Sequence, residues 1–593
     1  MKQFLKQVLA AVIGSVIGML LTFFIGIILI VVIAAAAFSS ASKEKTVHVK
    51  ANSVLHLNLT QPVTERTTNN PLKDFNFSSF TSNKQLGLND ILSAIENAKS
   101  DPDIKGIYMD MGSVPAGMAT VEEIRNALID FRKSGKFILS YSENYSQGAF
   151  YLASVADKIY LNPQGVMDWK GLSAQLMFFK GALEKLEINA QIFRHGKFKS
   201  AIEPFDLDKM SAANRLQTMS YMDALWNHLL EGITATRHVP AEELNRLADQ
   251  LGIRKPQDAL SHKFVDGLKY KDEIIDELKD KLALKEKSKI NFVELEDYSR
   301  AAKKDKKSGR EKIAVIYAVG TIGGGEGDEE NIGSDRISKT IREARLDSTI
   351  KAIVLRVNSP GGSALASDVI WREVLLAEKA KPVIVSMGDV AASGGYYISC
   401  AADIIVAQPN TITGSIGVFG LLPNAQKFFS DKLGITFDTA NTNKHADLGT
   451  PFRPVSPEEG RVIQESVEDI YNAFIGKVAD GRKKKSQEID SIGQGRVWSG
   501  TDAKRIGLVD TLGGIGTAIK IAARMAKTEN YRIIELPRQK DFWEALVKDI
   551  TEDSETRILK KELGLNYVYY NNFRDLALSR GVQARMPYDL LVY

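Results

Sequence analysis

The sequence contains very few of the side chains that build metal sites and covalent crosslinks. Its 593 residues include one cysteine and seven histidines, and no two histidines are spaced as an H-x-x-x-H pair. A single cysteine excludes a disulfide scaffold and a multi-cysteine zinc or iron–sulfur site. We therefore expect a protein that uses no metal and no cofactor.

The chain also has no large excess of charge of either sign. Lysine and arginine number 77 against 73 aspartate and glutamate, which leaves a net charge of +4. Nucleic-acid-binding domains usually carry a clustered basic excess. We expect no nucleic-acid partner.

Long apolar runs are absent except for one near the N-terminus. No charged residue occurs from Gln7 to Ser42, and 12–37 is almost wholly apolar. About 20 apolar residues span a bilayer, whereas the core of a cleaved signal peptide has about 7–15. The run therefore predicts an uncleaved transmembrane helix. Because only a short basic stub precedes it, we expect everything after about residue 45 to lie outside the cytoplasm.

The remainder of the chain contains an internal repeat. Residues 101–164 align with 347–410 at a shift of 246 residues without a gap, and 259–269 echo 503–513. A match of this length indicates two copies of one domain.

Each copy has the sequence pattern of an α/β domain. The runs IKGIYMDM (104–111) and IKAIVLRV (350–357) are typical of buried parallel strands, and each precedes an amphipathic helical stretch and a second apolar run. Strand, helix, strand is the order of a parallel sheet. We divide the chain into a stub and membrane anchor (1–45), a first repeat (46–285), a charged segment expected to be a solvated linker or extended arm (286–311), a second repeat (312–540) and a C-terminal tail without a counterpart (541–593).

Positions at which the copies differ are the best candidates for chemistry, and the first is a glycine-rich turn. The second copy has NSPGGS at 358–363, where the first has GSVPAG at 112–117. Gly361 and Gly362 allow backbone N–H groups to approach a bound atom closely. An oxyanion hole fits at least as well as a phosphate loop, which lacks its G-K-[ST] ending here, and a plain tight turn is the third possibility.

The second difference is a serine between small residues. Ser393 lies in GDVAASGG (388–395), and the paired residue of the first copy is Gln147. A serine at such a strand-to-helix turn can present its Oγ to a substrate, with the N–H of Gly394 as an oxyanion donor. A helix N-cap is the alternative.

A serine nucleophile needs a base, and the two copies differ here too. At a shift of 246, Lys199 of the first copy pairs with His445, the only histidine after Ser393. Lysine acts as a base only when neutral, which means lowering its pKa by roughly 3 units, or about 4 kcal/mol, through burial. A surface lysine and a Ser–His pair using His445 stay open at this point.

A further serine could support the lysine. Ser415 lies in TGSIG (413–417), which the first copy replaces with MDWKG (167–171). Its hydroxyl could hold the lysine amine by a hydrogen bond, and an ordinary turn serine is the alternative.

Four motifs together resemble a known family. NSPGGS (358–363), GDVAASGGYYIS (388–399), TGSIGVFG (413–420) and KSAIEPF (199–205) are similar to signal peptide peptidase A in its long, duplicated, membrane-anchored form, peptidase family S49. NSPGG alone would also fit Clp-type proteases or enoyl-CoA hydratase relatives. The resemblance implies a tandem duplication of a ClpP/crotonase-like domain, no metal and a bowl-shaped homo-oligomer, a tetramer.

The resemblance also implies roles for individual residues. Ser393 is the expected nucleophile and Lys199 the general base, Gly361, Gly362 and Gly394 belong to the oxyanion hole, and Ser415 supports the dyad. The expected function is a serine endopeptidase that degrades cleaved signal peptides and other apolar peptides. It would sit in the bacterial inner membrane, with its catalytic region on the periplasmic side.

Three alternatives accompany this expectation. The chain could be a membrane-bound scaffold of the same fold whose site has decayed, although the complementary serine and lysine argue against decay. It could carry out acyl-CoA chemistry, against which the apolar N-terminal run speaks. It could use His445 as the base.

Overall fold

The computed structural model describes residues 4, 11, 13–26, 48–68, 75–76, 81–82, 85–302, 309–539 and 582–586. The chain divides into two compact units, Met1–Val49 and Lys50–Tyr593. In the first unit residues 13–26 are helical. Within the described ranges no helix combines the length and the apolar character needed to cross a membrane. Much of the apolar run 12–37 lies outside these ranges.

The first repeat is built around a parallel sheet of six strands, in which every neighbouring pair is parallel. Apolar side chains of its central strands, such as Val54, Ile107 and Leu139, are fully buried. The strands, in spatial order, are β8 (Gly267–Leu268), β6 (Lys158–Met167), β5 (Phe137–Tyr145), β4 (Ile104–Asp110), β1 (Ser53–Leu57) and β9 (Asn291–Glu294).

The second repeat has the same order of strands, and two further strands extend it beside β15. This agreement confirms the prediction of a duplicated α/β domain. The strands are β20 (Thr511–Leu512), β16 (Ile404–Ala407), β15 (Val383–Ala392), β13 (Ile350–Ser359), β10 (Glu311–Val319) and β21 (Tyr531–Leu536), with β17 (Ile412–Gly414) and β19 (Val497–Ser499) continuing from β15.

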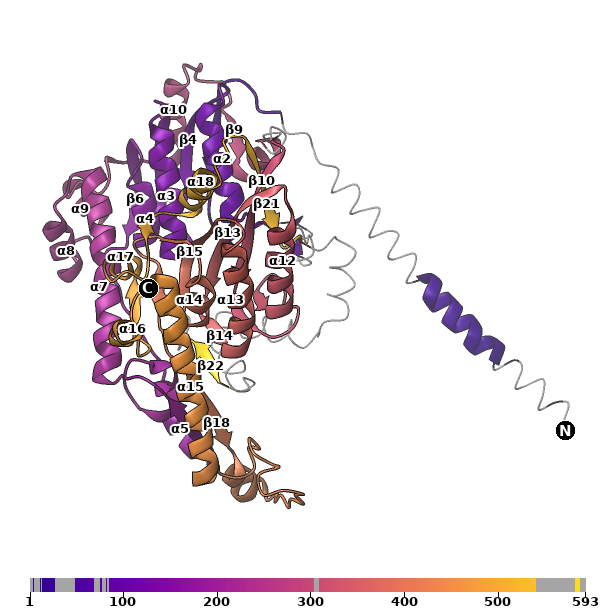
Figure 1. Cartoon of the computed structure of the whole chain (residues 1–593). Coiled ribbons are helices and arrows are strands. Elements are labelled where there is room, and N and C mark those ends of the chain that lie inside the picture. The colour runs from indigo at the N-terminus through magenta and orange to yellow at the C-terminus, as the bar shows by residue number, and fades with distance from the viewer. Residues whose placement is uncertain are drawn as a thin grey trace. The chain divides into compact units, whose positions relative to one another are not determined.

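Helices cover both sheets (Figure 1). Every helix given below for the second repeat has a counterpart in the first, whereas α5, α6 and α11 of the first repeat have none in the described part of the second. Those of the first repeat are α2 (Leu88–Ser100), α3 (Met118–Arg132), α4 (Gln147–Ala153), α5 (Lys180–Lys185), α6 (Glu203–Asp206), α7 (Ala212–Arg237), α8 (Ala241–Asp249), α9 (Pro256–Ser261), α10 (Lys271–Lys281) and α11 (Leu295–Ala302). Those of the second are α12 (Ser334–Leu346), α13 (Ala364–Glu378), α14 (Gly394–Ser399), α15 (Pro457–Arg482), α16 (Ser486–Ile492), α17 (Gly500–Arg505) and α18 (Ile515–Met525).

The charged segment between the repeats is not the solvated linker that its composition predicts. Strand β9 pairs in parallel with β1 and closes the edge of the first sheet, and α11 follows it directly. In the second sheet β21 takes the same place beside β10. The linker expectation is therefore wrong for 291–302, because the apolar residues among the charges, such as Val293 and Leu295, are buried.

A third sheet joins the two repeats and the C-terminal segment. Its strands, in spatial order, are β12 (Asn331–Gly333), β11 (Thr321–Gly323), β14 (Gly361–Ser363), β22 (Gln583–Arg585), β18 (Phe419–Asn424) and β7 (Asn189–Arg194). Of these, β7 belongs to the first repeat and β22 to the C-terminal tail. A separate short pair is formed by β2 (Phe75–Asn76) and β3 (Thr81–Ser82).

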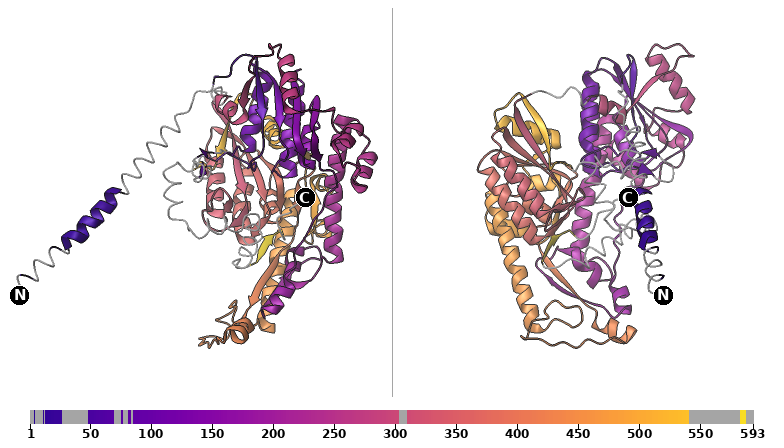
Figure 2. Two further views of the ribbon diagram at one scale, coloured as in Figure 1. Left: turned by 180° about the vertical axis from the view of Figure 1, so that it is seen from behind. Right: turned by 90° about the vertical axis from the view of Figure 1, so that its right-hand side faces the viewer.

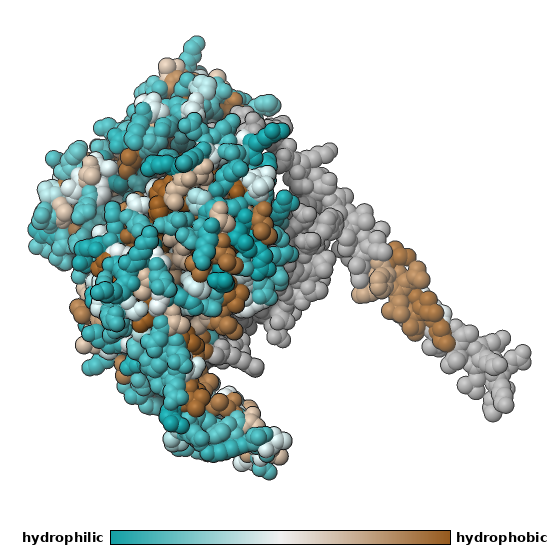
Figure 3. All heavy atoms as spheres, in the orientation of Figure 1, coloured by the Kyte–Doolittle hydropathy of each residue, from teal (hydrophilic) through white to brown (hydrophobic). Residues whose placement is uncertain are grey.

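Strands β7 and β18, with residues 425–456 that follow β18, form what we call the arm. Figure 2 shows it extending from the two main sheets alongside the end of α15. Part of its surface is apolar (Figure 3). The arm matters for the site because β7 leads directly to Lys199.

Candidate active site

Ser393 lies at a strained turn between β15 and α14. Its φ of 55° and ψ of −113° lie outside the regions that residues with a side chain usually adopt. Its N–H donates to the carbonyl of Gly414, and the residue is fully buried. Ser393 stands at the N-cap position of α14, but its side chain makes no capping hydrogen bond, so capping does not account for its hydroxyl.

Lys199 reaches the second repeat from the first through the arm. Strand β7 pairs antiparallel with β18, from Phe419 opposite Arg194 to Asn424 opposite Asn189. Five residues after β7 the chain brings Lys199 into the interior, where it is fully buried. The N–H of Phe198 donates to the carbonyl of Gln494, which fixes the backbone before the lysine.

The two predicted dyad residues meet within one chain. Lys199 Nζ lies 2.8 Å from Ser393 Oγ. It also lies 3.1 Å from Ser415 Oγ and 3.3 Å from the carbonyl oxygen of Ser415. Ser415, with a φ of 51°, is held by the bond from its N–H to the carbonyl of Arg496. The structure thus places all three side chains together, as the motifs imply.

Burial sets the charge of the lysine. Its removal from water lowers the pKa of Lys199 from 10.5 to about 7. The oxygens around Nζ belong to hydroxyls and a carbonyl, so they carry no full negative charge that would restore the ammonium. Near neutral pH a large fraction of Lys199 is therefore a free amine. The alternative that Lys199 is an ordinary surface lysine is therefore wrong.

Gly361 and Gly394, two of the three glycines predicted to form the oxyanion hole, lie in contact with each other beside Ser393. A methyl group placed on Gly361, whose φ is +101°, would lie 2.7 Å from the backbone nitrogen of Gly394. The N–H of Gly361 donates to Ser359 Oγ at 3.2 Å. Gly362 lies one residue further along β14, where it pairs with Ile322 of β11. Gly361 and Gly394 are therefore better placed to face a carbonyl at Ser393 than Gly362.

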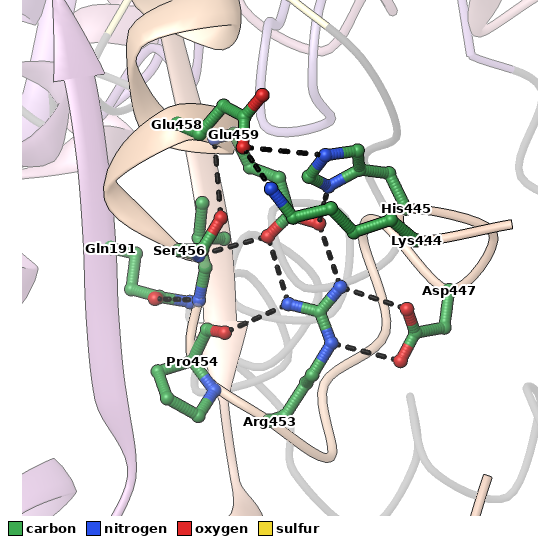
Figure 4. Close-up of polar contacts among 10 residues, drawn as sticks. Gln191, Lys444, His445, Asp447, Arg453, Pro454, Ser456, Glu458 and Glu459 are labelled. Carbon is green, nitrogen blue, oxygen red and sulfur yellow. Dashed lines mark hydrogen bonds and ion pairs between the residues drawn. The ribbon is translucent and has the colours of Figure 1, made fainter. Parts of the chain in front are cut away.

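His445 has other partners and lies in the arm (Figure 4). Its Nδ1 lies 2.9 Å from Glu459 Oε1, and its Nε2 lies 3.6 Å from Glu458. Arg453 ties the same carboxylate of Glu459 to Asp447 through paired hydrogen bonds. This polar cluster braces the residues between β18 and α15. The Ser–His alternative does not fit, because Lys199 occupies the place beside Ser393.

The first copy has a structural side chain where the second has its serine. The amide of Gln147 accepts hydrogen bonds from the N–H groups of Lys170 and Gly171 and donates to the carbonyl of Gly171. These bonds tie the start of α4 to the segment that corresponds to TGSIG. The first copy therefore contributes the lysine and a scaffold, but no second nucleophile at this position.

Two features of the site are not evident from the motifs. Residues 583–585 near the C-terminus form β22 beside Gly361 and Gly362. Arg356 of β13 is fully buried between two carboxylates of the first repeat, Glu65 and Glu123. Arg356 stands inside the apolar run IKAIVLRV, and a charged residue at the centre of a buried strand is a signal that could have predicted such an ion pair.

Both copies of the domain match the same family of known proteins. The model of peptidase family S49 matches residues 130–285 and 376–529. "Protease 4" of Salmonella typhi is 40% identical over 484 residues, which cover 80% of this chain and 76% of that protein. "Protease 4" of Haemophilus influenzae is 35% identical (85% and 83% covered), and "Serine protease SPPA, chloroplastic" of Arabidopsis thaliana is 32% identical (85% and 74% covered).

A solved structure of a mutant ClpP1 from Listeria monocytogenes also matches. Its TM-score is 0.24 at 15% identity, with 35% of this chain and 94% of that chain covered. A score this low supports no further conclusion.

Proposed function

Because the chain belongs to peptidase family S49 and is a serine peptidase, we propose that it is a membrane-anchored endopeptidase that degrades cleaved signal peptides and other apolar peptides. Ser393 is the nucleophile and Lys199 the general base. The observation that supports these roles most strongly is the 2.8 Å separation of Lys199 Nζ and Ser393 Oγ in a fully buried setting.

The first step is proton transfer between the two side chains. With Lys199 neutral, its N–H bonds point to the hydroxyl and carbonyl oxygens of Ser415, and its lone pair is left for the hydroxyl proton of Ser393. Oγ then attacks the peptide carbonyl while Nζ takes the proton. The resulting ammonium protonates the leaving amine, and an acyl-enzyme remains on Ser393. Water, deprotonated by the same amine, releases the acyl group.

The N–H groups of Gly361 and Gly394 stabilise the negative oxygen that forms in each step. To do so, Gly361 exchanges its hydrogen bond with Ser359 Oγ for one to the substrate. Preorganised backbone donors of this kind typically contribute about 10²–10³ in rate.

The apolar N-terminal run supports the membrane anchor and the substrate class. No charged residue occurs from Gln7 to Ser42, and the helical residues 13–26 lie inside this run. An enzyme anchored by this segment in the bacterial inner membrane, with its catalytic unit in the periplasm, would meet signal peptides where they are released.

A homo-oligomer, a tetramer by family resemblance, is part of the proposal. What supports it is the apolar surface of the arm, where Leu433, Ile435, Phe437 and Leu448 are 43–52% exposed. Exposed apolar surface of this kind is typical of contact sites between proteins. The mass of the detergent-solubilised protein by light scattering tests this part of the proposal.

A serine-directed covalent probe tests the enzymatic role. We expect a fluorophosphonate to label Ser393, as located by peptide mass mapping, and the purified chain to cleave a synthetic signal peptide faster than a polar peptide of equal length. Ser393→Ala should abolish both labelling and cleavage. A folded protein that neither labels nor cleaves would instead be the inactive scaffold.

A further inference from the structure

The amine of Lys199 is held in place by neutral groups. Its Nζ contacts Ser393 Oγ and the hydroxyl and carbonyl oxygens of Ser415. A carboxylate beside Nζ would stabilise the ammonium and remove the free amine that catalysis needs. Because a lysine side chain is a flexible four-carbon stem, and neutral hydrogen bonds are weaker than charged ones, the position of Nζ depends on how firmly the backbone of Lys199 is held.

Residues 494–497, which we call the bridging segment, lie against the backbone of Lys199. The carbonyl of Gln494 accepts a hydrogen bond from the N–H of Phe198 at 3.0 Å. A methyl group on Gly495 would lie 2.6 Å from the backbone nitrogen of Lys199. Gln494 itself has a φ of 52°, a conformation that residues with a side chain rarely adopt, so its neighbours hold it there.

The bridging segment also holds the residues around Ser415. The N–H of Gly495 donates to the carbonyl of Ile416 at 2.7 Å, and the N–H of Ser415 donates to the carbonyl of Arg496 at 2.7 Å. The segment is therefore bonded to both stretches of chain whose side chains meet at the amine. A displacement of the segment would change the position of the base relative to the groups that it contacts.

Gln217 of α7 ties the bridging segment to the residues on either side of Lys199. This glutamine is buried. Its amide nitrogen donates to the carbonyl of Phe198 at 3.0 Å and to Ser200 Oγ at 2.9 Å. Its amide oxygen accepts from the N–H of Val497 at 3.2 Å. One side chain of the first repeat thus joins both neighbours of the base to the second repeat.

Tyr471 of α15 holds the same segment from the second repeat. Its buried hydroxyl accepts from the N–H of Gln494 at 3.2 Å and donates to Asp490 Oδ1 at 2.6 Å. Its ring stacks on that of His195, with centroids 3.7 Å apart, and His195 precedes Lys199 by four residues. Helix α15 packs against α16 and α7 against β19, the two elements that the bridging segment connects (Figure 1).

We propose that Gln217 and Tyr471 are positioning residues for the general base, which hold the bridging segment against the backbone of Lys199 so that Nζ faces the nucleophile. The proposal rests on the proposed peptidase function and adds two residues that lie outside all four family motifs. Neither side chain contacts the hydroxyl of Ser393. Their loss should therefore slow the chemical step and leave the binding of substrate unchanged.

The first experiment measures cleavage of a synthetic signal peptide by the full chain carrying Gln217→Met or Tyr471→Phe. Each substitution keeps most of the side-chain volume and removes the polar atoms. We expect kcat to fall about tenfold or more, because a small misplacement of a reacting group is costly, with KM unchanged within about twofold. The midpoint of the pH profile of kcat/KM should rise from about 7 towards about 8, because a loosened Lys199 regains contact with water and its pKa rises.

Two control variants remove similar hydrogen bonds elsewhere. Tyr298→Phe deletes a buried hydroxyl that donates to Asp101 Oδ2 at 2.9 Å. Gln147→Met deletes the backbone hydrogen bonds of another buried glutamine. Both controls should keep the kcat and the pH midpoint of the unaltered chain at a temperature where near-ultraviolet circular dichroism shows every variant folded. If Gln217→Met and Tyr471→Phe behave like their controls in both quantities, the two residues have a purely structural role and the proposal is wrong.

The second experiment tests whether the effect passes through the lysine. Labelling of Ser393 by a fluorophosphonate is followed over time by intact mass. We expect Tyr471→Phe to lower the labelling rate constant about tenfold in the unaltered chain and to have no effect in a chain that carries Lys199→Met, because the base that Tyr471 positions is then absent. An equal loss in the two backgrounds would contradict the proposal.

The same measurement separates this proposal from the proposed peptidase function. An unaltered, folded chain whose Ser393 takes up no label would refute the peptidase role, and the positioning role with it. Rapid labelling of the unaltered chain, together with equally rapid labelling of Gln217→Met and Tyr471→Phe, would refute the positioning role alone.

Discussion

At the scale of single residues, the properties of the site depend on a lysine that is kept out of water. An amine buried among hydroxyls loses its proton more readily than one in solvent, and this gives Lys199 the pKa of about 7 that a general base needs at neutral pH. Because of the same burial, a protonated Lys199 would destabilise the folded protein. Substitution of Lys199 can therefore test its effect on stability separately from its role in catalysis.

Replacing Lys199 by methionine should abolish activity without unfolding the protein. Methionine keeps most of the apolar volume but has no basic atom, so we expect the kcat for peptide cleavage to fall by about 10³ or more, the size typical of losing a base in a catalytic pair. Near-ultraviolet circular dichroism checks that the fold is intact. Retention of more than a tenth of the activity would show that another group serves as the base.

The pH dependence of kcat/KM should follow the neutral amine. Because catalysis needs deprotonated Lys199, we expect kcat/KM to rise with pH through about 7 and then level off.

The stability of the folded protein should also increase with pH. Between about 7 and 10.5 the unfolded chain binds the proton and the folded chain does not, so the free energy of unfolding rises across this range. Lys199→Met should lack this rise. Equal slopes of stability against pH for both proteins would contradict the assignment.

At the scale of elements, the sequence predicts the repeat well and the connections poorly. The strands and helices of each copy follow from apolar periodicity, and the 246-residue register by itself places Ser393 opposite Gln147. Strand β9 is missed because its few apolar residues stand among charges. A faint echo of FVELE (292–296) in IIELP (533–537), the sequence of β21, could have revealed it.

The repeat register singles out Lys199 and Ser393 as candidates, but only the family resemblance indicates that the two side chains meet. The pairing of β7 with β18 joins segments more than 220 residues apart, and nothing in either strand alone specifies its partner. The same holds for β22, whose edge-to-edge pairing uses backbone groups that every residue carries. Such pairings depend on which strand edges the folded chain brings together, and no local sequence pattern predicts them.

The turn between α16 and β19 positions the lysine by close backbone contact. Gly495 has a φ of +79°, and a methyl group there would lie 2.6 Å from the backbone nitrogen of Lys199. We expect Gly495→Ala to displace Lys199 and to lower kcat/KM by about 10², which a misplacement of about 1 Å can cause.

Gly434→Ala is the matched control for this substitution. Gly434 has a similar φ of +68° but open space around it, so it carries the backbone strain without the collision. Gly434→Ala should lose about 1 kcal/mol of stability through backbone strain alone, Gly495→Ala should lose more because of the collision, and only Gly495→Ala should lose activity. Equal activities would show that the turn does not position the base.

At the scale of the whole molecule, the two repeats are locked together by a buried ion network. Arg356 of the second sheet lies 2.8 Å from Glu65 and 2.7 Å from Glu123, and it donates to Ser386 Oγ. Burial raises the pKa of Glu123, whereas the facing carboxylates outweigh burial and raise that of Arg356. Each buried charge of the network therefore has its partner only while the two repeats are docked.

Arg356→Met should destabilise the protein because it leaves two carboxylates buried without a cation. We expect a loss of about 3–5 kcal/mol at pH 8, seen as a lower urea midpoint, and a smaller loss at pH 5, where the carboxylates can bind protons. Arg505→Met removes a surface partner of Asp502, with Arg505 69% exposed, and should cost less than 1 kcal/mol. Similar midpoints for the two variants would contradict the role of the network.

The passage of β7 from one repeat into the sheet of the other has a consequence for stoichiometry. Each half of the gene duplication supplies one member of the pair, and at a shift of 246 residues Gln147 and His445 are the residues that align with Ser393 and Lys199. An assembly of n chains should therefore bear n reactive serines rather than 2n. Titration with a covalent inhibitor should reach its plateau at one equivalent per 65.4 kDa of protein, whatever the number of subunits. Neither half produced alone should consume any inhibitor, and the two halves mixed should regain the single equivalent.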